Sequence, residues 1–248
     1  MSNRFERFSH SSNPVLNEKS LAQESTAYVG ENLRTFTTQS AINKTFVLLG
    51  LLLFTAVVGY RFPSPILVWG GAIGGLIVVV ISVFRKAWSP ILAPLYAILE
   101  GFFVGGISAM YASLAGGIIL QAVSLTLLVF FVMLVIYKTR IIPVTNKFRL
   151  GLIMATGGIF LIYLLSWILG MFGIHIPYIH EGGTFGILFS VAVLGIASLN
   201  LLLDFDMFEK AEEYRAPRYM EWFAGMALLI TLVWIYIEFL RLLTKLRN

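Results

Sequence analysis

Four carboxylates in strongly apolar surroundings are the residues of this sequence best suited to chemistry. Glu100 and Glu238 lie inside apolar stretches, whereas Asp204 and Asp206 stand at the end of another one. A carboxylate at membrane depth is costly, so it usually faces the interior of a helix bundle, pairs with another group, or handles an ion. The chemistry indicated by these residues is therefore the binding of protons or cations.

Glu238 is the most informative of the four because it lies within the last apolar stretch. On a helix it would share one face with Thr231, Trp234 and Arg241. One interpretation is an ion pair between Glu238 and Arg241 near the outer membrane surface, with the arginine head reaching toward water. The other is an acidic site whose protonation opens a pathway. The residues alone are compatible with both.

The remaining acidic residues also allow two interpretations each. Asn200 and Asp204 share a helix face, but Asp204 and Asp206 differ by about 200°, so we expect one aspartate to face the bundle and the other the cytoplasmic interface. Asp206 belongs either to the acidic site or to the solvated helical extension at 209–215. Glu100, near mid-bilayer, is either a proton or cation site or a carboxylate hydrogen-bonded to a neighbouring helix.

Composition indicates which elements position these residues. The chain has 248 residues, of which 58% are hydrophobic and only 12% are charged, and a soluble domain would carry about twice that charged share. Seven apolar stretches are each long enough to cross a hydrocarbon core of about 30 Å. They are Thr45–Tyr60, Pro65–Phe84, Pro90–Leu114, Gly116–Tyr137, Leu150–Phe172, Thr184–Leu203 and Met220–Leu243. The sequence predicts an all-α integral membrane protein.

The distribution of basic residues predicts the orientation. With alternating loops, one side carries Arg34, Lys44, Arg85, Lys86, Lys138, Arg140, Lys147, Arg149, Lys210, Arg215 and Arg218. The other side carries Arg61, Arg241, Lys245 and Arg247. Because basic loops stay in the cytoplasm, we expect the N-terminus inside and the C-terminus outside. This bias also explains the net charge of +5 without nucleic-acid binding.

Two regions complete the predicted organisation. Residues 1–43 are polar and lack the apolar core of a signal peptide, so we expect a cytoplasmic tail followed by a membrane domain at 44–248. The loop at 173–183 contains His175, His180 and Glu181, whose spacing matches no zinc motif. We therefore expect no bound metal and no cofactor.

Two segments near the end of the chain carry a family resemblance. Ser198–Asp206 (SLNLLLDFD) followed by Val233–Leu243 (VWIYIEFLRLL) resembles the paired acidic motifs of the Bax inhibitor family in its bacterial branch. Glu100–Gly106 and Thr38–Thr45 are similar to earlier segments of that family. The resemblance covers about residues 38–245, and the order and spacing of the motifs make it fairly specific.

The resemblance implies a seven-helix bundle with the last helix central. It also implies a pH-sensitive leak of calcium or other cations, in which Asp204 and Glu238 form a proton-responsive latch. Glu238 stands where the family usually has Asp. The predicted helix ends separate the two carboxylates in depth by roughly 15–20 Å, which argues against a direct hydrogen bond unless the sixth helix runs farther inward.

Three functions follow from these observations. The first is a cation leak in the bacterial plasma membrane, gated by Asp204 and Glu238, with Glu100 along the path and with calcium or protons as partners. The second is an interaction protein without transport, which binds another membrane protein through its tail and through Glu209–Arg218. The third, an intramembrane aspartyl protease, is disfavoured because the residues flanking Asp204 and Glu238 do not match such enzymes. We therefore expect no enzymatic activity.

Overall fold

The computed structural model describes residues 35–114, 116–173 and 183–247. Within these residues it contains seven helices that are long and apolar enough to cross a membrane, and no β-strand. They are α2 (Thr38–Arg61), α3 (Pro65–Phe84), α4 (Ser89–Leu114), α5 (Ile118–Lys138), α6 (Asn146–Met171), α7 (Thr184–Glu213) and α8 (Met220–Arg247), with a short 3₁₀ helix, η1 (Lys86–Trp88), before α4. The prediction of an all-α, seven-span protein is confirmed.

The helix ends differ from the apolar stretches at two informative places. The first helix begins at Thr38, within the predicted tail, because the Thr37 side chain accepts a hydrogen bond from the Ser40 amide and caps the helix. The sixth membrane-spanning helix, α7, continues through Glu213, well past Leu203. Hydropathy reports only the lipid-embedded part of a helix, whereas the Glu-, Lys- and Ala-rich segment that follows favours continued helix.

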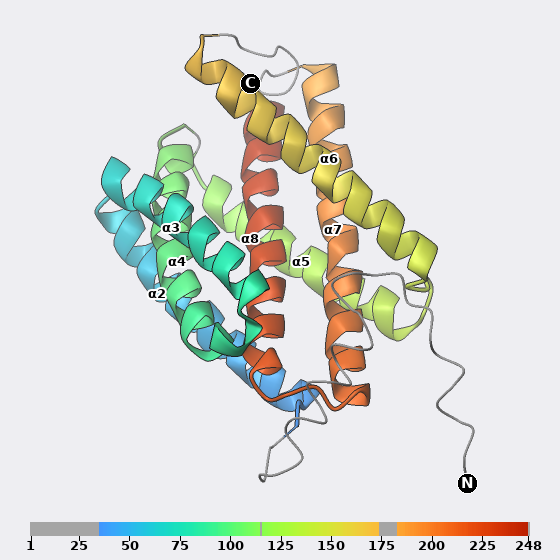
Figure 1. The fold of residues 1–248 in the computed structure, drawn as a ribbon. Helices are drawn as coiled ribbons and strands as arrows, with labels where there is room; N and C mark the ends of the chain where they lie inside the picture. The colour runs from blue at the N-terminus through green and yellow to red at the C-terminus, as the bar shows by residue number, and fades with distance from the viewer. Residues whose placement is uncertain (1–34, 115, 174–182, 248) are drawn as a thin grey trace, which may run out of the picture.

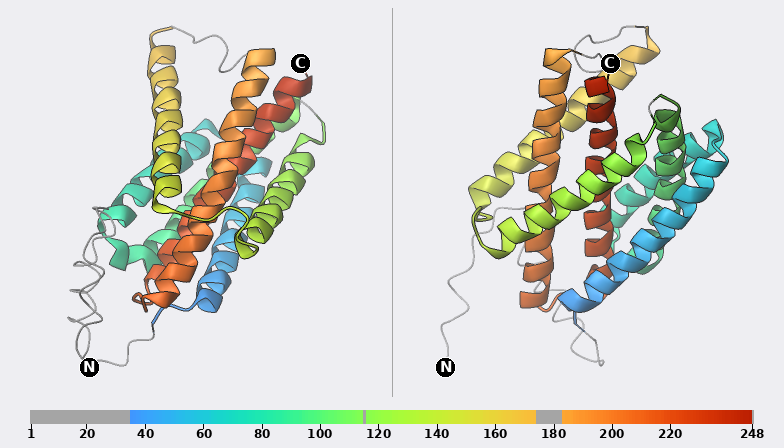
Figure 2. Two further views of the ribbon diagram at one scale, coloured as in Figure 1. Left: turned by 90° about the vertical axis from the view of Figure 1, so that its right-hand side faces the viewer. Right: turned by 180° about the vertical axis from the view of Figure 1, so that it is seen from behind.

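The central element of the bundle is α8, which the other helices surround (Figures 1 and 2). On one side α4 packs against both α2 and α3, and on the other α7 packs against α5 and α6. The central helix contacts α2, α4, α5 and α7 directly, and its side chains Leu229, Ile235 and Leu240 are fully buried. The expectation of a central last helix is confirmed.

Glycines allow α4 to approach α2 at backbone distance. A Cβ atom on Gly101 would lie 2.4 Å from the Leu52 carbonyl oxygen, and one on Gly105 would lie 2.1 Å from that of Ala56. Such distances are possible only without a side chain, as in other membrane helix pairs with small residues four apart. A Cβ atom on Gly70 of α3, by contrast, would meet nothing within 4 Å.

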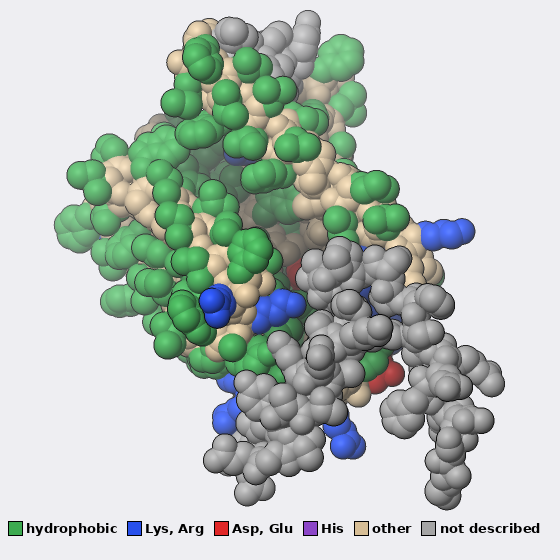
Figure 3. Space-filling model, in the orientation of Figure 1, with side chains coloured by type: hydrophobic (Ala, Val, Ile, Leu, Met, Phe, Trp, Pro, Cys, Tyr) green, Lys and Arg blue, Asp and Glu red, His purple; other side chains and the backbone are tan. Residues whose placement is uncertain are grey.

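The outside of the bundle is covered by apolar side chains (Figure 3). Phe54, Ile66 and Phe84 are 71%, 82% and 81% exposed, respectively. In water this surface would be strongly unfavourable, whereas acyl chains solvate it without cost. The lipid bilayer is therefore the solvent of this fold, and the polar side chains buried inside it need a specific explanation.

Candidate functional site

Glu238 lies on α8 with no exposed surface. Its Oε1 atom accepts a hydrogen bond of 2.9 Å from the Tyr163 hydroxyl of α6 and an ion-pair contact of 3.1 Å from Arg241. The predicted pair within the helix is thus confirmed, and Tyr163 is an additional partner. The second oxygen, Oε2, is buried and has no hydrogen-bond partner among the described residues.

Aromatic rings enclose this carboxylate on the α6 side. The Arg241 guanidinium lies 4.7 Å from the centre of the Tyr163 ring, close enough for a cation–π interaction. Tyr163 in turn packs edge-to-face against Phe189 of α7 at 6.1 Å. Three helices therefore fix the position of a single acidic group.

Asp204 lies inside α7 and faces the central helix. Its carboxylate is beside the Thr231 side chain of α8, and its Oδ2 atom is buried without a hydrogen-bond partner in the described part of the chain. Thr231 precedes Glu238 by about two helical turns, or roughly 10 Å along the axis. The two carboxylates therefore occupy separate positions along α8, but their separation is smaller than the roughly 15–20 Å expected from the apolar stretches. The helix α7 does run farther inward than its hydropathy indicates.

Asn200, one turn before Asp204, makes its hydrogen bonds elsewhere. Its Nδ2 atom donates to the Thr156 hydroxyl of α6 and to the Ile196 carbonyl oxygen, both at 2.9 Å. The amide therefore connects α7 to α6 and does not bond to Asp204. Within the predicted group, Asn200 is a contact between helices.

Asp206 is buried, contrary to the interpretation that assigned it to a solvated extension. It is only 5% exposed, and it forms ion pairs with Arg149 of α6 and with Lys210, the latter at 3.0 Å. The interpretation was wrong because one of the two counter-charges, Arg149, comes from a different helix, which no local sequence pattern reveals. Asp204 and Asp206 do point in different directions, but toward α8 and α6.

Glu100 forms a separate acidic position on α4. It is 9% exposed, and neither a hydrogen bond nor an ion pair reaches its carboxylate from the described residues. A Cβ atom on Gly75 of α3 would lie 2.9 Å from its Oε2 atom, so the missing side chain makes space for the carboxylate. A bond of 2.7 Å between Ser108 and Tyr236 connects α4 to α8, and α4 lies on the opposite side of α8 from α7 (Figure 1).

One buried acidic residue escaped the sequence analysis. Glu221, in the first turn of α8, is 1% exposed and pairs with Lys44 of α2. Its position beside Trp222 at the start of an apolar stretch was the only available signal. The partner lies far away in the sequence, so only the tertiary structure identifies the pair.

No group of three or more potential metal ligands occurs among the described residues, and the loop with His175, His180 and Glu181 lies outside them. Figure 3 shows a hollow between α3 and α6 with an acidic side chain at its floor. Buried oxygens without a partner, such as Asp204 Oδ2 and Glu238 Oε2, can accept a proton or transiently contact a cation.

Comparison with known proteins agrees with this architecture. The family model described as Bax inhibitor 1 like matches residues 13–248, which includes every described helix and each acidic position discussed above. No curated protein matches the chain significantly. The chain is therefore a multi-pass membrane protein that belongs to the Bax inhibitor 1-like family.

Proposed function

We propose that this protein is a cation leak pathway controlled by protonation of Asp204 and Glu238, with calcium as the ion that the family resemblance suggests. The observation that supports the proposal most directly is the pair of buried, unpartnered oxygens, Asp204 Oδ2 and Glu238 Oε2. A buried acceptor without a donor is unfavourable, and a proton or a passing cation would relieve the cost at both positions.

The contacts of Glu238 suggest how protonation would act. In its charged form, Glu238 attracts Arg241 and accepts the hydrogen bond from Tyr163, which holds α6 against α8. Protonation removes the charge and weakens both interactions. Because α6 otherwise packs mainly on α7, it could then separate from α8 and open the hollow between α3 and α6.

Glu100 would contribute on the other side of α8. It is buried, it lacks a partner, and it lies against Gly75. We assign it to the same pathway as a third protonation site, after Asp204 and Glu238. In this proposal the protein is not an enzyme and needs no cofactor.

The proposed location is the bacterial plasma membrane, with the N-terminus in the cytoplasm and the C-terminus outside. Lys and Arg side chains on the face in Figure 3 gather mainly at the end where α8 begins. This asymmetry is the one expected of a cytoplasmic end.

Calcium flux into dye-loaded liposomes tests the proposal on the purified full chain. Wild-type flux should rise as the medium becomes acidic, whereas Glu238→Gln and Asp204→Asn, which imitate protonation of one site each, should show raised flux with a weaker dependence on pH. Glu213→Gln is the matched control, because Glu213 is exposed on the same helix as Asp204. Absence of flux at every pH, or unchanged pH profiles in both variants, would refute the proposal.

A second candidate function is supported by a different observation. The end of the tail and the α7–α8 loop lie together, since Thr38 donates a 2.5 Å hydrogen bond to Glu212 and Thr35 pairs with Pro217. They could form one cytoplasmic surface that binds another membrane protein. Cross-linking in the native membrane from a photoreactive residue at position 214 tests this candidate, which fails if no partner is recovered.

A further inference from the structure

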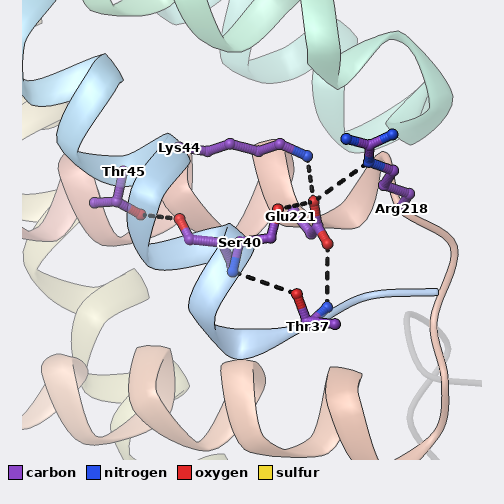
Figure 4. Close-up of polar contacts among 7 residues, drawn as sticks. Thr37, Ser40, Lys44, Thr45, Arg218 and Glu221 are labelled. Atoms are coloured by element: carbon purple, nitrogen blue, oxygen red, sulfur yellow. Dashed lines mark hydrogen bonds and ion pairs between the residues drawn. The ribbon is translucent and has the colours of Figure 1, made fainter. Parts of the chain in front are cut away.

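Glu221 collects an unusual number of donors at the base of the central helix. Its Oε1 atom accepts a hydrogen bond of 3.1 Å from the Thr37 amide, and its Oε2 atom accepts one of 2.8 Å from the Ser40 hydroxyl (Figure 4). Lys44 binds the same Oε2 atom, and Arg218 Nε lies 4.0 Å from it. All except Arg218 belong to the N-cap and the first two turns of α2.

Backbone and apolar contacts reinforce this attachment. The Phe36 amide donates a hydrogen bond of 2.8 Å to the Ala216 carbonyl oxygen, next to the antiparallel bridge between Thr35 and Pro217. The Phe36 ring is 2% exposed and packs edge-to-face against Phe208 at 6.2 Å. The segment therefore contacts the end of α7, the connecting loop and the start of α8 together.

The position of Glu221 gives these contacts mechanical importance. The carboxylate lies in the first turn of α8, where the unpaired amides of a helix favour a negative charge. A buried carboxylate that loses its partners is strongly unfavourable. Glu221 therefore opposes separation of residues 35–44 from the first turn of α8. Glu221 and Glu238 are on the same continuous helix.

We infer that Thr35–Lys44 is a clamp that fixes the first turns of α8 through Glu221, so that release of this segment would loosen the start of the central helix. The clamp contacts the end of α7 and the start of α8. The consequence for ion flux rests on the proposed function. The clamp itself is independent of the proposed function.

A cysteine pair tests the clamp in the full chain, which has no native cysteine. Partners of an antiparallel bridge have Cα atoms about 4.5–5.5 Å apart, within the range of a disulfide. Thr35→Cys with Pro217→Cys should therefore cross-link readily. Adding Glu221→Gln should slow cross-linking and speed hydrogen exchange at Met220–Ala227 by about threefold or more, whereas adding Glu213→Gln should change neither.

The outcomes separate the clamp from the leak. Unchanged cross-linking and exchange in Glu221→Gln would overturn the clamp while leaving pH-dependent flux intact. Ser40→Ala, which removes a single donor, should give a smaller change in the same direction and serves if Glu221→Gln does not fold.

If oxidation of the cysteine pair lowers flux and reduction restores it, the clamp controls the pathway. Equal flux in both states would refute that control. Absence of flux in the wild type would refute the proposed function, and the exchange data would still decide the clamp.

Discussion

The Tyr163 hydroxyl donates a hydrogen bond of 2.9 Å to Glu238, which connects α6 to the central helix of the bundle. Apart from this bond, α6 packs mainly on α7, and only 17% of its most apolar stretch is buried inside the protein. The bond therefore joins the helix that is least buried inside the protein to the one that is most buried. Loss of this hydrogen bond should change both the stability and the function of the protein.

Tyr163→Phe should lower the free energy of unfolding by about 1.5–3 kcal/mol, because it removes a hydrogen bond to a charged acceptor. Thermal unfolding of the detergent-solubilised protein measures the change. Tyr214→Phe is the matched control, since Tyr214 is 66% exposed and should tolerate loss of its hydroxyl. Equal stability of the two variants would mean that the bond contributes nothing.

Gly105→Ala should push α2 away from α4. The new Cβ atom would lie 2.1 Å from the Ala56 carbonyl oxygen, which is backbone and cannot rotate away, so we expect a destabilisation of about 1–3 kcal/mol. Gly158→Ala in α6 meets nothing within 4 Å and should be neutral or stabilising by about 0.5–1 kcal/mol. Thermal unfolding distinguishes them, and similar midpoints would contradict the close packing of α2 and α4.

Asp206→Leu should be among the most damaging substitutions at the cytoplasmic end. It leaves Arg149 without its partner in a largely buried position, and breaking such pairs costs up to about 3–5 kcal/mol. The double variant Arg149→Met with Asp206→Leu should recover most of the loss, because the former partner that still lacks a counter-charge is then Lys210, whose side chain is 35% exposed. Lys147→Met, at an exposed position, should have little effect. Failure of the double variant to recover would show that the pair has no such role.

Engineered cysteines should reveal the orientation in sealed cells. Tyr214→Cys, in the α7–α8 loop, should react with an impermeant maleimide only after permeabilisation, whereas Leu114→Cys, at the opposite end of the bundle, should react without it. Both positions are well exposed, at 66% and 69%, so reactivity reports the side of the membrane. The reverse pattern would place the N-terminus outside.

The apolar stretches located the helices closely but not their ends. Pro65–Phe84 was predicted at the residues observed, because lipid burial demands one continuous apolar run. Thr38 and Glu213 were missed as helix ends because capping and helix propensity continue a helix beyond the lipid. Hydropathy measures neither helix capping nor intrinsic helix propensity.

The partners of the acidic residues were also predictable only in part. The pairing of Glu238 with Arg241 was predictable, since three residues along a helix bring side chains together. The partners Tyr163 of Glu238, Arg149 of Asp206 and Lys44 of Glu221 come from other helices. No local pattern encodes them.

The sequence by itself determined that the chain crosses a membrane seven times, and that it keeps carboxylates within that membrane. Both follow from the cost of exposing polar groups to lipid, which each stretch of chain must satisfy alone. Only the tertiary structure decided which carboxylates are paired and which oxygens remain free. Asp206 finds an arginine, whereas Asp204 and Glu238 each keep one unpartnered oxygen, because helix packing sets which side chains meet across the bundle.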